Sequence, residues 1–462
     1  MRAENRREER YAWERANLAP WAYLSEYASE RDHADPDDNY RTRFQRDRDR
    51  VLGCAFFRQL SEKTQVFLYS ESDVFRRRLT HVLEVHRLAL TLSDHLYANN
   101  DLVSAIAYCH DIGHLPFGHA SEETITEQMK LFGQGARTYP HAAHGLRVVE
   151  CLADENFDDH RYFGLNLTRE VREGVLKHSG PVEFSGEEFA AMRPSSPCFI
   201  EGQVVQKADL VASLVADFDD AIRIGLVKLS DLLGVEGLMD YLNKFRKGGS
   251  PQATVGSIKS FSSLRSKLTW SLMQDVIDTT YAVLRNGFPG GEAFDGRTGG
   301  IVHKAEDIEN YIRKPERLGD TFPGGDPRRP DYMLGWVYPN IVRLSRDGIR
   351  VAEGMWKLRS DKVWASSLVT RMNEKAKSVI GTLCRLLAGQ PKLMYHRGRP
   401  YSEDLIKEKY MNLGLDLEGA MAGKNPSDLR RLVVDYIASL SDMSAIEEYQ
   451  RLTDPQRHVV RG

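Results

Sequence analysis

Apolar residues recur at spacings of three and four over residues 79–92, and the same spacing continues through residues 101–112. This period places the apolar side chains on one face of an α-helix. Helical spacing persists almost throughout residues 51–223. Few windows show the alternation of apolar and polar residues that is typical of a strand, and residues 64–69 are a candidate short hairpin strand. The sequence therefore predicts a mainly α fold. Asp101 is predicted to cap the second of these helices, and Gly113 with Pro116 to end it.

Composition along the chain predicts four regions. Residues 1–50 are polar and dense in mixed charge, which predicts an N-terminal arm, and residues 51–235 form a helical block. Residues 236–345 are predicted to be helical with Gly/Pro-rich insertions at 247–251 and 287–330, which have the composition of surface loops, lids or regulatory segments. Residues 346–462 are predicted to form a C-terminal helical domain.

Bulk properties exclude several classes of protein. The formal net charge of −3 gives no general attraction to nucleic acid or membranes. No apolar run approaches the roughly 20 residues of a membrane helix, and the first residues lack the apolar core of a signal peptide. The five cysteines are scattered without CxxC spacing, so we expect a reduced, cytoplasmic protein without structural disulfides.

Two histidines and two aspartates in apolar surroundings predict a metal site. His110 and Asp111 end a strongly apolar run, His81 lies on the helix predicted upstream, and Asp209 follows an apolar stretch further on. A buried Asp111 without a charge partner would cost several kcal/mol, and a metal ion would supply that partner. Imidazole and carboxylate ligands suit a hard or borderline divalent ion. A lone buried histidine is usually a core residue, and the alternative for Asp209 is a salt bridge to Lys207 or Arg223.

Longer stretches of the chain carry a family resemblance. The sequence HDIGHLPFGHASE at 110–122 and DYIASLSD at 435–442 are the most specific, and an HD pair alone is weak because many phosphohydrolases carry it. With them, the chain resembles the HD-domain deoxynucleoside triphosphate triphosphohydrolases, the dGTPase-like family. Further matching segments are 47–50, 63–66, 78–85, 164–170, 176–178, 217–225 and 372–380.

The resemblance implies a fold, a cofactor and an activity. It implies an HD-domain helical bundle at 51–235, extended by the second, C-terminal helical block. Its His…His-Asp…Asp pattern is matched by metal ligands at His81, His110, Asp111 and Asp209, for Mn, Mg, Fe, Ni or Co. The implied reaction is hydrolysis of a dNTP, with a dGTP-like preference as one option, to deoxynucleoside and triphosphate by water attack at the α-phosphorus. Control of the dNTP pool, including phage defence, would be the biological role.

Family members commonly form dimers of trimers or tetramers and often bind a second nucleotide. A homo-oligomer, hexamer or tetramer, with an allosteric nucleotide site is therefore expected.

His119 and Glu122 are predicted to form an acid/base pair. They are three residues apart, so on a helix they share a face and can activate water or protonate the 5′-oxygen. The alternative for Glu122 is a first-turn carboxylate favoured by the helix dipole. His114 is a further catalytic candidate, and His141 matches a family histidine that would serve the phosphates or the leaving group.

Four residues are predicted to bind substrate. Arg78, one helical turn before His81, matches a family arginine near the phosphates, and Asp217 matches a residue that binds the sugar 3′-hydroxyl. Lys177 and His178 also match, and their alternative is a solvated polar face. The chain has Ser213 where the family carries a tyrosine that packs on deoxyribose. This change loosens discrimination against ribonucleotides unless an aromatic residue of 270–345 takes the place of the tyrosine ring.

Two rival functions remain open. The first is another HD phosphohydrolase, such as a 5′-nucleotidase or a phosphodiesterase. The second is a non-catalytic nucleotide or single-strand nucleic-acid sensor. The arginines in 41–50 and 76–78 could contact phosphates, but Asp47 and Asp49 interrupt the first cluster, so nucleic acid is a secondary expectation.

Overall fold

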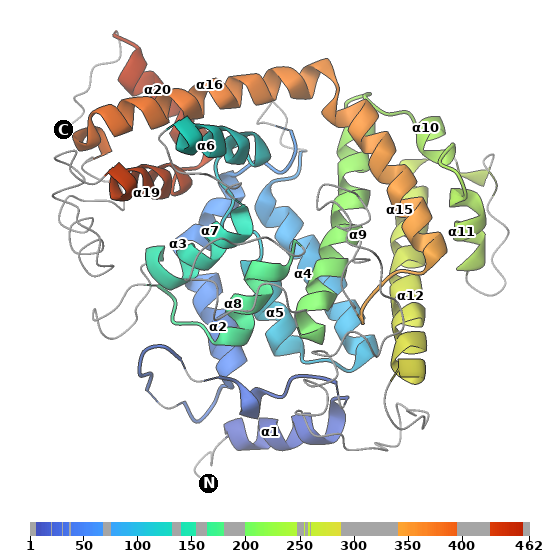
Figure 1. Cartoon of the computed structure of the whole chain (residues 1–462). Helices are drawn as coiled ribbons and strands as arrows, with labels where there is room; N and C mark the ends of the chain where they lie inside the picture. The colour runs from blue at the N-terminus through green and yellow to red at the C-terminus, as the bar shows by residue number, and fades with distance from the viewer. Residues whose placement is uncertain are drawn as a thin grey trace. The chain divides into compact units, whose positions relative to one another are not determined.

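The described residues of the computed structural model are mainly helical (Figure 1). The chain divides into two compact units. Unit 1 comprises residues 1–51, 81–110 and 167–366, and unit 2 comprises residues 52–80, 111–166 and 367–462. The structure describes residues 6–19, 21–29, 31–36, 38–67, 75–131, 140–153, 164–179, 199–246, 254, 257–258, 260–287, 341–394 and 426–455.

Unit 1 is assembled around one long helix, α9 (Ile200–Arg223). Apolar residues such as Val204, Val211 and Phe218 are fully or almost fully buried on this helix. Helices α5, α8, α12 and α15 all contact it, so the apolar face of α9 forms the centre of the unit. The helices that lie wholly or mainly in unit 1 are α1 (Arg6–Asn17), α2 (Arg43–Gly53), α4 (Arg78–Leu96), α5 (Asn100–Cys109), α8 (Arg169–Lys177), α9, α10 (Leu229–Leu233), α11 (Leu238–Lys244), α12 (Phe261–Gly287) and α15 (Arg346–Arg359), with the short 3-10 helix η1 (Ser25–Tyr27) and the short π-helix η7 (Ser360–Trp364).

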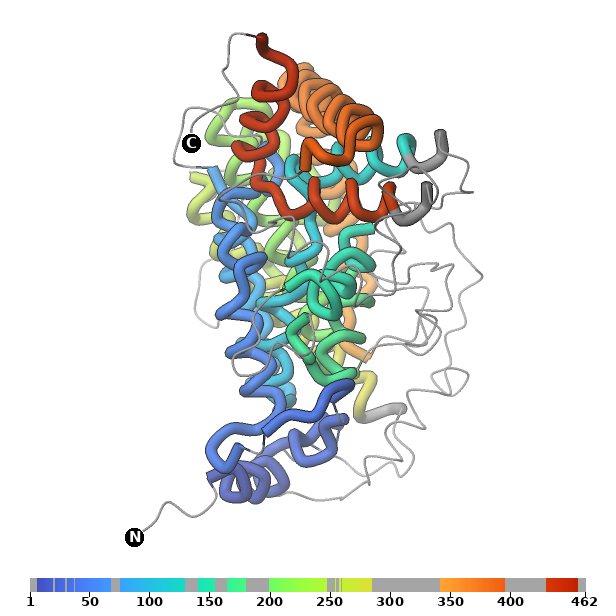
Figure 2. The backbone as a smooth tube through the Cα atoms, turned by 90° about the vertical axis from the view of Figure 1, so that its left-hand side faces the viewer, coloured from blue at the N-terminus to red at the C-terminus, as the bar shows by residue number. Residues whose placement is uncertain are grey.

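Unit 2 has its own apolar core. Helix α16 (Ser367–Gly389) contacts α6, α19 and α20 (Figure 2). Ile380 and Leu383 of α16 and Ile437 of α19 are fully buried in the core cluster. The remaining elements are α3 (Ala55–Gln59), η2 (Leu60–Glu62), α6 (His119–Leu131), α7 (His141–Arg147), η3 (Val148–Leu152), η8 (Pro391–Met394), α19 (Pro426–Ala438) and α20 (Asp442–Thr453).

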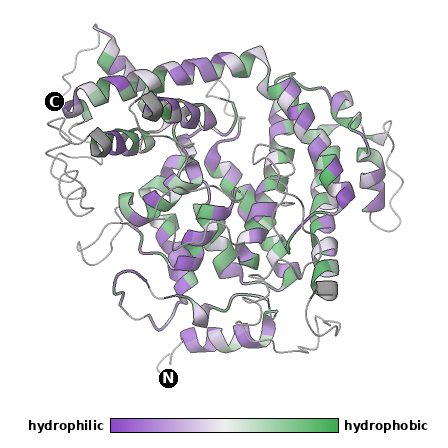
Figure 3. Ribbon diagram, in the orientation of Figure 1, coloured by the Kyte–Doolittle hydropathy of each residue, from purple (hydrophilic) through white to green (hydrophobic). Residues whose placement is uncertain are grey.

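The helices alternate hydrophobic and hydrophilic residues along their length, as periodicity predicts (Figure 3). The predicted mainly α class is confirmed, since the described residues form helices and no strand. Thr64, in the candidate hairpin strand 64–69, makes one isolated antiparallel bridge with Arg77, and residues 68 and 69 lie outside the described residues. Most of the predicted insertions at 247–251 and 287–330 also lie outside them.

One predicted helix start is wrong by two residues. The N-cap of α5 is Asn99, whose side-chain oxygen accepts from the backbone N–H groups of Asp101 and Leu102. Asp101 lies instead in the first turn, where its carboxylate is 2.9 Å from the Gln45 amide nitrogen. Asparagine and aspartate are comparable caps, so the local sequence does not distinguish them.

Within the described residues, no helix is both long and apolar enough to cross a membrane. The described cysteines, Cys54, Cys109, Cys151 and Cys384, are free thiols, and Cys198 lies outside the described residues.

Close packing of α8 against α5 gives a first testable prediction. A Cβ atom added at Gly174 would lie 2.6 Å from Ile106 Cδ1, whereas one added at Gly381 of α16 would lie 3.6 Å from its nearest neighbour, Thr124. Gly174→Ala should therefore destabilise the protein by about 1–3 kcal/mol through overpacking. Gly381→Ala, the matched control, should leave stability unchanged or raise it by about 0.5–1 kcal/mol because alanine favours a helix. Thermal unfolding measures both, and equal effects would contradict the packing argument.

Candidate functional site

The predicted ligands of unit 1 come from three helices. His81 lies in the second turn of α4, His110 directly follows α5, and Asp209 lies on α9. His81 Nε2 is 2.9 Å from Asp209 Oδ1, and the His81 and His110 ring centroids are 5.7 Å apart. A third imidazole, His178, has its ring centroid 5.2 Å from that of His110. Unit 1 therefore brings His81, His110 and Asp209 together, with His178 beside them.

The environment of His110 fits metal ligation. Its Nδ1 atom is 2.7 Å from the carbonyl oxygen of Ala107, and the side chain is fully buried. A carbonyl oxygen only accepts, so Nδ1 carries a proton, and in the neutral ring the lone pair is on Nε2. A backbone carbonyl on one ring nitrogen is the usual way in which a protein orients a histidine whose other nitrogen binds a metal.

Asp111 begins the second segment of unit 2 and has partners within that unit. Arg78 Nη1 donates to its Oδ2 over 2.9 Å, and His114 Nε2 lies 3.0 Å from its Oδ1. Arg78, Asp111 and His114 are all buried. Because Arg78 supplies a positive charge, the burial of Asp111 does not by itself require a metal ion, which corrects the argument from burial cost. Asp111 nevertheless follows His110 directly in the chain, and Asp111, His114 and His141 of unit 2 form a group that could hold a metal ion.

Glu122 is contacted by three imidazoles. Its carboxylate oxygens lie 3.1 Å from His114 Nδ1, 3.3 Å from His119 Nδ1 and 3.3 Å from His141 Nδ1. His119 and Glu122 occupy the first turn of α6, so the predicted pairing at a spacing of three is present, and Glu122 also has the first-turn position of the alternative interpretation. The His119 side chain is 73% exposed, whereas that of Glu122 is 14% exposed. His119 is therefore the member of the pair that an incoming molecule reaches.

Gly113 permits the approach that brings His141 to this group. A Cβ atom at Gly113 would lie 2.1 Å from the backbone nitrogen of Gly145 and 2.2 Å from the carbonyl oxygen of His141. Without that atom, α7 packs directly on the turn after Asp111. The His141 and His114 rings are consequently stacked, with centroids 3.8 Å apart.

The charges of this group are set by its neighbours. Burial alone would raise the pKa of Glu122, but the charges of His119 and His141 and hydrogen bonds from His114 and His119 hold that pKa well below its usual range. The Glu122 charge in turn raises the pKa of His119. Burial, and then the charges of Arg78 and His141, lower the pKa of His114 to about 3. At neutral pH Glu122 is thus ionised, His114 is neutral, and His119 holds its proton to higher pH than an ordinary histidine.

The predicted substrate-binding residues have protein partners. Asp217, on α9, accepts a 2.7 Å hydrogen bond from Arg359. Lys177 pairs with Glu173 one helical turn earlier, and His178 Nδ1 is 2.6 Å from the carbonyl oxygen of Val175. All of these predicted residues are buried rather than on a solvated face.

Arg359 is a residue that sequence reasoning missed. Its guanidinium carbon also lies 4.5 Å from the Trp364 ring centroid, so one side chain links a buried carboxylate and an indole. Arg359 and Asp217 are 142 positions apart, and no local pattern indicates that they meet.

The Ser213 hydroxyl, one turn before Asp217 on α9, donates to Asp209 over 3.2 Å. Arg223, offered as an alternative partner of Asp209, is 3.2 Å from Asp219.

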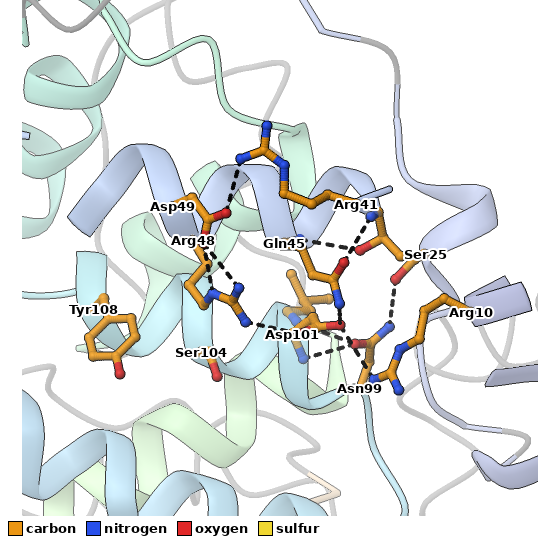
Figure 4. Close-up of polar contacts among 12 residues, drawn as sticks. Arg10, Ser25, Arg41, Gln45, Arg48, Asp49, Asn99, Asp101, Ser104 and Tyr108 are labelled. Atoms are coloured by element: carbon orange, nitrogen blue, oxygen red, sulfur yellow. Dashed lines mark hydrogen bonds and ion pairs between the residues drawn. The ribbon is translucent and has the colours of Figure 1, made fainter. Parts of the chain in front are cut away.

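The arginine-rich segment 41–50 is occupied by contacts within unit 1 (Figure 4). Arg41 contacts Asp49 over 3.1 Å, and Arg48 contacts both Asp49 and Asp101 over 3.0 and 3.3 Å. Arg10 of α1 reaches Asp101 as well, over 3.4 Å. These guanidinium groups hold α1 and α2 against α5, which weakens the nucleic-acid interpretation of the cluster.

Comparisons with known proteins agree with this geometry. The HD domain model matches residues 78–214, and the phosphohydrolase-associated domain model matches residues 350–451. A deoxyguanosinetriphosphate triphosphohydrolase-like protein of Ralstonia nicotianae is 31% identical over 443 residues, 94% of each chain. The chain belongs to the deoxyguanosinetriphosphate triphosphohydrolase-like family. Relatives with the same name from Syntrophus aciditrophicus and Geobacter metallireducens are 31% and 39% identical over 97% and 96% of this chain, and 97% of their own length.

This membership confirms the family recognised from the sequence and supports a phosphohydrolase. HD domains bind divalent metals, and the His/Asp groups of this HD domain could hold one. The HD match covers all of the predicted site residues except Asp217, and the phosphohydrolase-associated match covers most of the chain from α15 to α20.

The effect of the His119 and Glu122 charges on one another's pKa gives a second prediction. Glu122→Gln removes the negative charge and should lower the pKa of His119 towards its ordinary value. The midpoint of the His119 ring titration, followed by NMR, should therefore move to lower pH. Glu123→Gln is the matched control, because Glu123 is the next residue on α6, is 59% exposed and pairs with Lys377. A His119 midpoint that is the same in both variants would contradict the pairing.

Proposed function

We propose that this chain hydrolyses deoxynucleoside triphosphates to deoxynucleoside and intact triphosphate, by water attack at the α-phosphorus. The observation that carries the proposal is the Glu122 carboxylate surrounded by three imidazoles, one of them the exposed His119. An ionised carboxylate next to a histidine of raised pKa is a proton-donating pair. The choice of a deoxynucleoside triphosphate as substrate rests on family membership, since the relatives are named deoxyguanosinetriphosphate triphosphohydrolase-like proteins.

We assign His81, His110, Asp111 and Asp209 as the residues that would hold a divalent ion. Two imidazoles and two carboxylates suit Mn, Fe, Ni, Co or Mg, and the ligand set does not select among them. Such an ion, when bound, polarises a phosphoryl oxygen and lowers the pKa of water. Binding would require His81 and Asp209 to exchange part of their 2.9 Å contact for the ion.

The reaction requires two proton movements. The water oxygen forms a bond to the α-phosphorus and releases a proton to the solvent, while the bond from phosphorus to the 5′-oxygen breaks and that oxygen gains a proton. His119 is assigned as the acid for the 5′-oxygen, because the Glu122 charge raises its pKa and so favours its protonated form. His114 is too weakly basic to carry this proton at neutral pH, and the single N–H of its neutral ring can orient either Asp111 or Glu122. His141, 3.3 Å from Glu122, is assigned to the phosphates or the leaving group.

Arg78, Lys177, His178 and Asp217 are assigned to substrate binding. Arg78 combines a position beside Asp111 with a guanidinium that suits phosphate oxygens. Asp217 already pairs with Arg359, so a sugar hydroxyl would have to share that carboxylate or displace the guanidinium. Ser213, beside Asp209, is smaller than a tyrosine, and we propose that sugar selectivity is consequently relaxed.

Regulation and assembly belong to the same proposal. A homo-oligomer, hexamer or tetramer, would sediment well above the 52.5 kDa of one chain, and a monomer at micromolar concentration would contradict it. An activating nucleotide would appear as turnover only in nucleotide mixtures. A role in dNTP-pool control, including phage defence, would follow from the activity.

Product analysis tests the proposed reaction. Purified protein with Mn²⁺ or Mg²⁺ is incubated with each dNTP and with GTP, singly and mixed, and products are separated by anion exchange. We expect tripolyphosphate and free deoxynucleoside, and loss of at least about 10²-fold in rate with His119→Ala if it is the general acid. Asp111→Ala should abolish turnover. His95→Ala removes another exposed histidine, at the end of α4, and should leave the rate unchanged.

The products also separate the rival functions. Orthophosphate or pyrophosphate in place of tripolyphosphate would indicate another HD phosphohydrolase. No turnover of any nucleotide, with metal shown to be bound, would contradict the enzyme and favour a nucleotide or nucleic-acid sensor.

A further inference from the structure

The turn between His114 and α6 is tied to the C-terminal helices by two buried polar side chains. Lys63, which is 1% exposed, donates from Nζ to the carbonyl oxygens of His114, over 2.6 Å, and Ala438, over 3.0 Å. Asp442, which is 3% exposed and opens α20, accepts from the backbone N–H of Phe117 over 2.9 Å. All of these residues belong to unit 2. One contact holds the start of the turn and the other holds its end.

The two side chains are also joined to each other through the backbone. Asp442 accepts from the backbone N–H of Thr64 over 3.0 Å and from the Thr64 hydroxyl. The carbonyl oxygen of Lys63 accepts from the backbone N–H of Arg78 over 3.0 Å, and Arg78 is the residue that pairs with Asp111. Residues 63–64 therefore link α20, the turn and the first residue of α4.

The conformation of the turn needs this support. Phe117 has a φ of +62°, in the left-handed region that side chains other than glycine rarely adopt. Such a residue persists only where the surrounding structure fixes it, and here Asp442 holds its N–H while its ring is buried in the core of unit 2. Two residues later, His119 begins α6 and faces Glu122, so the direction of the turn sets where that imidazole lies.

We propose that Lys63 and Asp442 are positioning residues, which hold the turn 114–118 so that His114 and His119 keep their orientation towards Glu122. The inference rests on the proposed function for its effect on catalysis. It gives the C-terminal phosphohydrolase-associated region a role in the reaction. It also assigns a role to residues within two family-matching stretches, 63–66 and 435–442, to which the catalytic proposal assigns none. Neither side chain touches the reacting atoms.

Asp442→Asn tests the proposal, with Glu448→Gln as its matched control. Asparagine keeps the shape but offers one acceptor oxygen, so it cannot satisfy both Phe117 and Thr64. Glu448 is also a carboxylate of α20, is 1% exposed, and pairs with Arg451 within that helix over 2.9 Å. Both variants lose one buried negative charge from one helix, so a general loss of stability should be similar in both.

The expected result separates positioning from stability. In Asp442→Asn, kcat should fall by up to about 10²-fold while KM changes little, because the acid is displaced but the substrate contacts remain. Hydrogen exchange of the Phe117 amide, measured without substrate, should be faster than in Glu448→Gln. Asp442→Glu, which restores the charge and both acceptor oxygens, should recover part of kcat. Lys63→Met, which releases His114 instead, provides a second variant in case Asp442→Asn does not fold.

Equal kcat and equal Phe117 exchange in Asp442→Asn and Glu448→Gln would overturn the proposal. Should the wild-type protein hydrolyse no nucleotide, the proposed function fails, and the exchange comparison still decides whether Asp442 holds the turn.

Discussion

The Asp111 carboxylate is almost completely removed from water, and its negative charge must be balanced inside the protein. Arg78 and His114 are its neighbours within unit 2, and each of these also serves a further contact. The backbone N–H of Arg78 donates to the carbonyl oxygen of Lys63, and His114 faces Glu122 with its other ring nitrogen. Removal of the Asp111 charge would therefore disturb both the acid/base group and the start of α4.

A second group of ionisable side chains lies in unit 1. One of its members, His110, directly precedes Asp111 in the chain. His81 and Asp209 are in contact, His110 lies beside His81, and the carbonyl oxygen of Ala107 fixes which His110 nitrogen carries the lone pair. His110 and Asp111, which are consecutive in the chain, are both among the metal ligands that we propose, and Glu122 with His119 is the acid/base pair that we propose. Hydrolysis of a phosphate ester can use both a metal ion and a proton donor.

The sequence predicted features that depend on local spacing. The helical period gave the mainly α class, and the spacing of three between His119 and Glu122 gave a contact that the structure shows at 3.3 Å. Asp101 was predicted as a cap and Asn99 has that position, because the two residue types favour it almost equally. The burial argument for a metal at Asp111 omitted Arg78, although the sequence places this arginine one turn before His81.

Long-range pairs could not be predicted from one sequence. Asp217 and Arg359 are 142 positions apart, and Thr64 and Asp442 are 378 apart. Such pairs form because two buried polar groups must satisfy one another once the apolar faces have packed. Their partners depend on the packing of α9 with α15, and of α6, α16 and α20, which hydrophobic periodicity does not specify.

The assignment of His81, His110, Asp111 and Asp209 as ligands of one divalent ion is the central claim. The most direct measurement is electron spin-echo spectroscopy of the protein loaded with one equivalent of Mn²⁺, which detects nitrogen atoms bonded to the ion. The account predicts couplings from two imidazole nitrogens, one of which disappears in His110→Ala. A bound Mn²⁺ without any nitrogen coupling, or with couplings unchanged in His110→Ala, would contradict it.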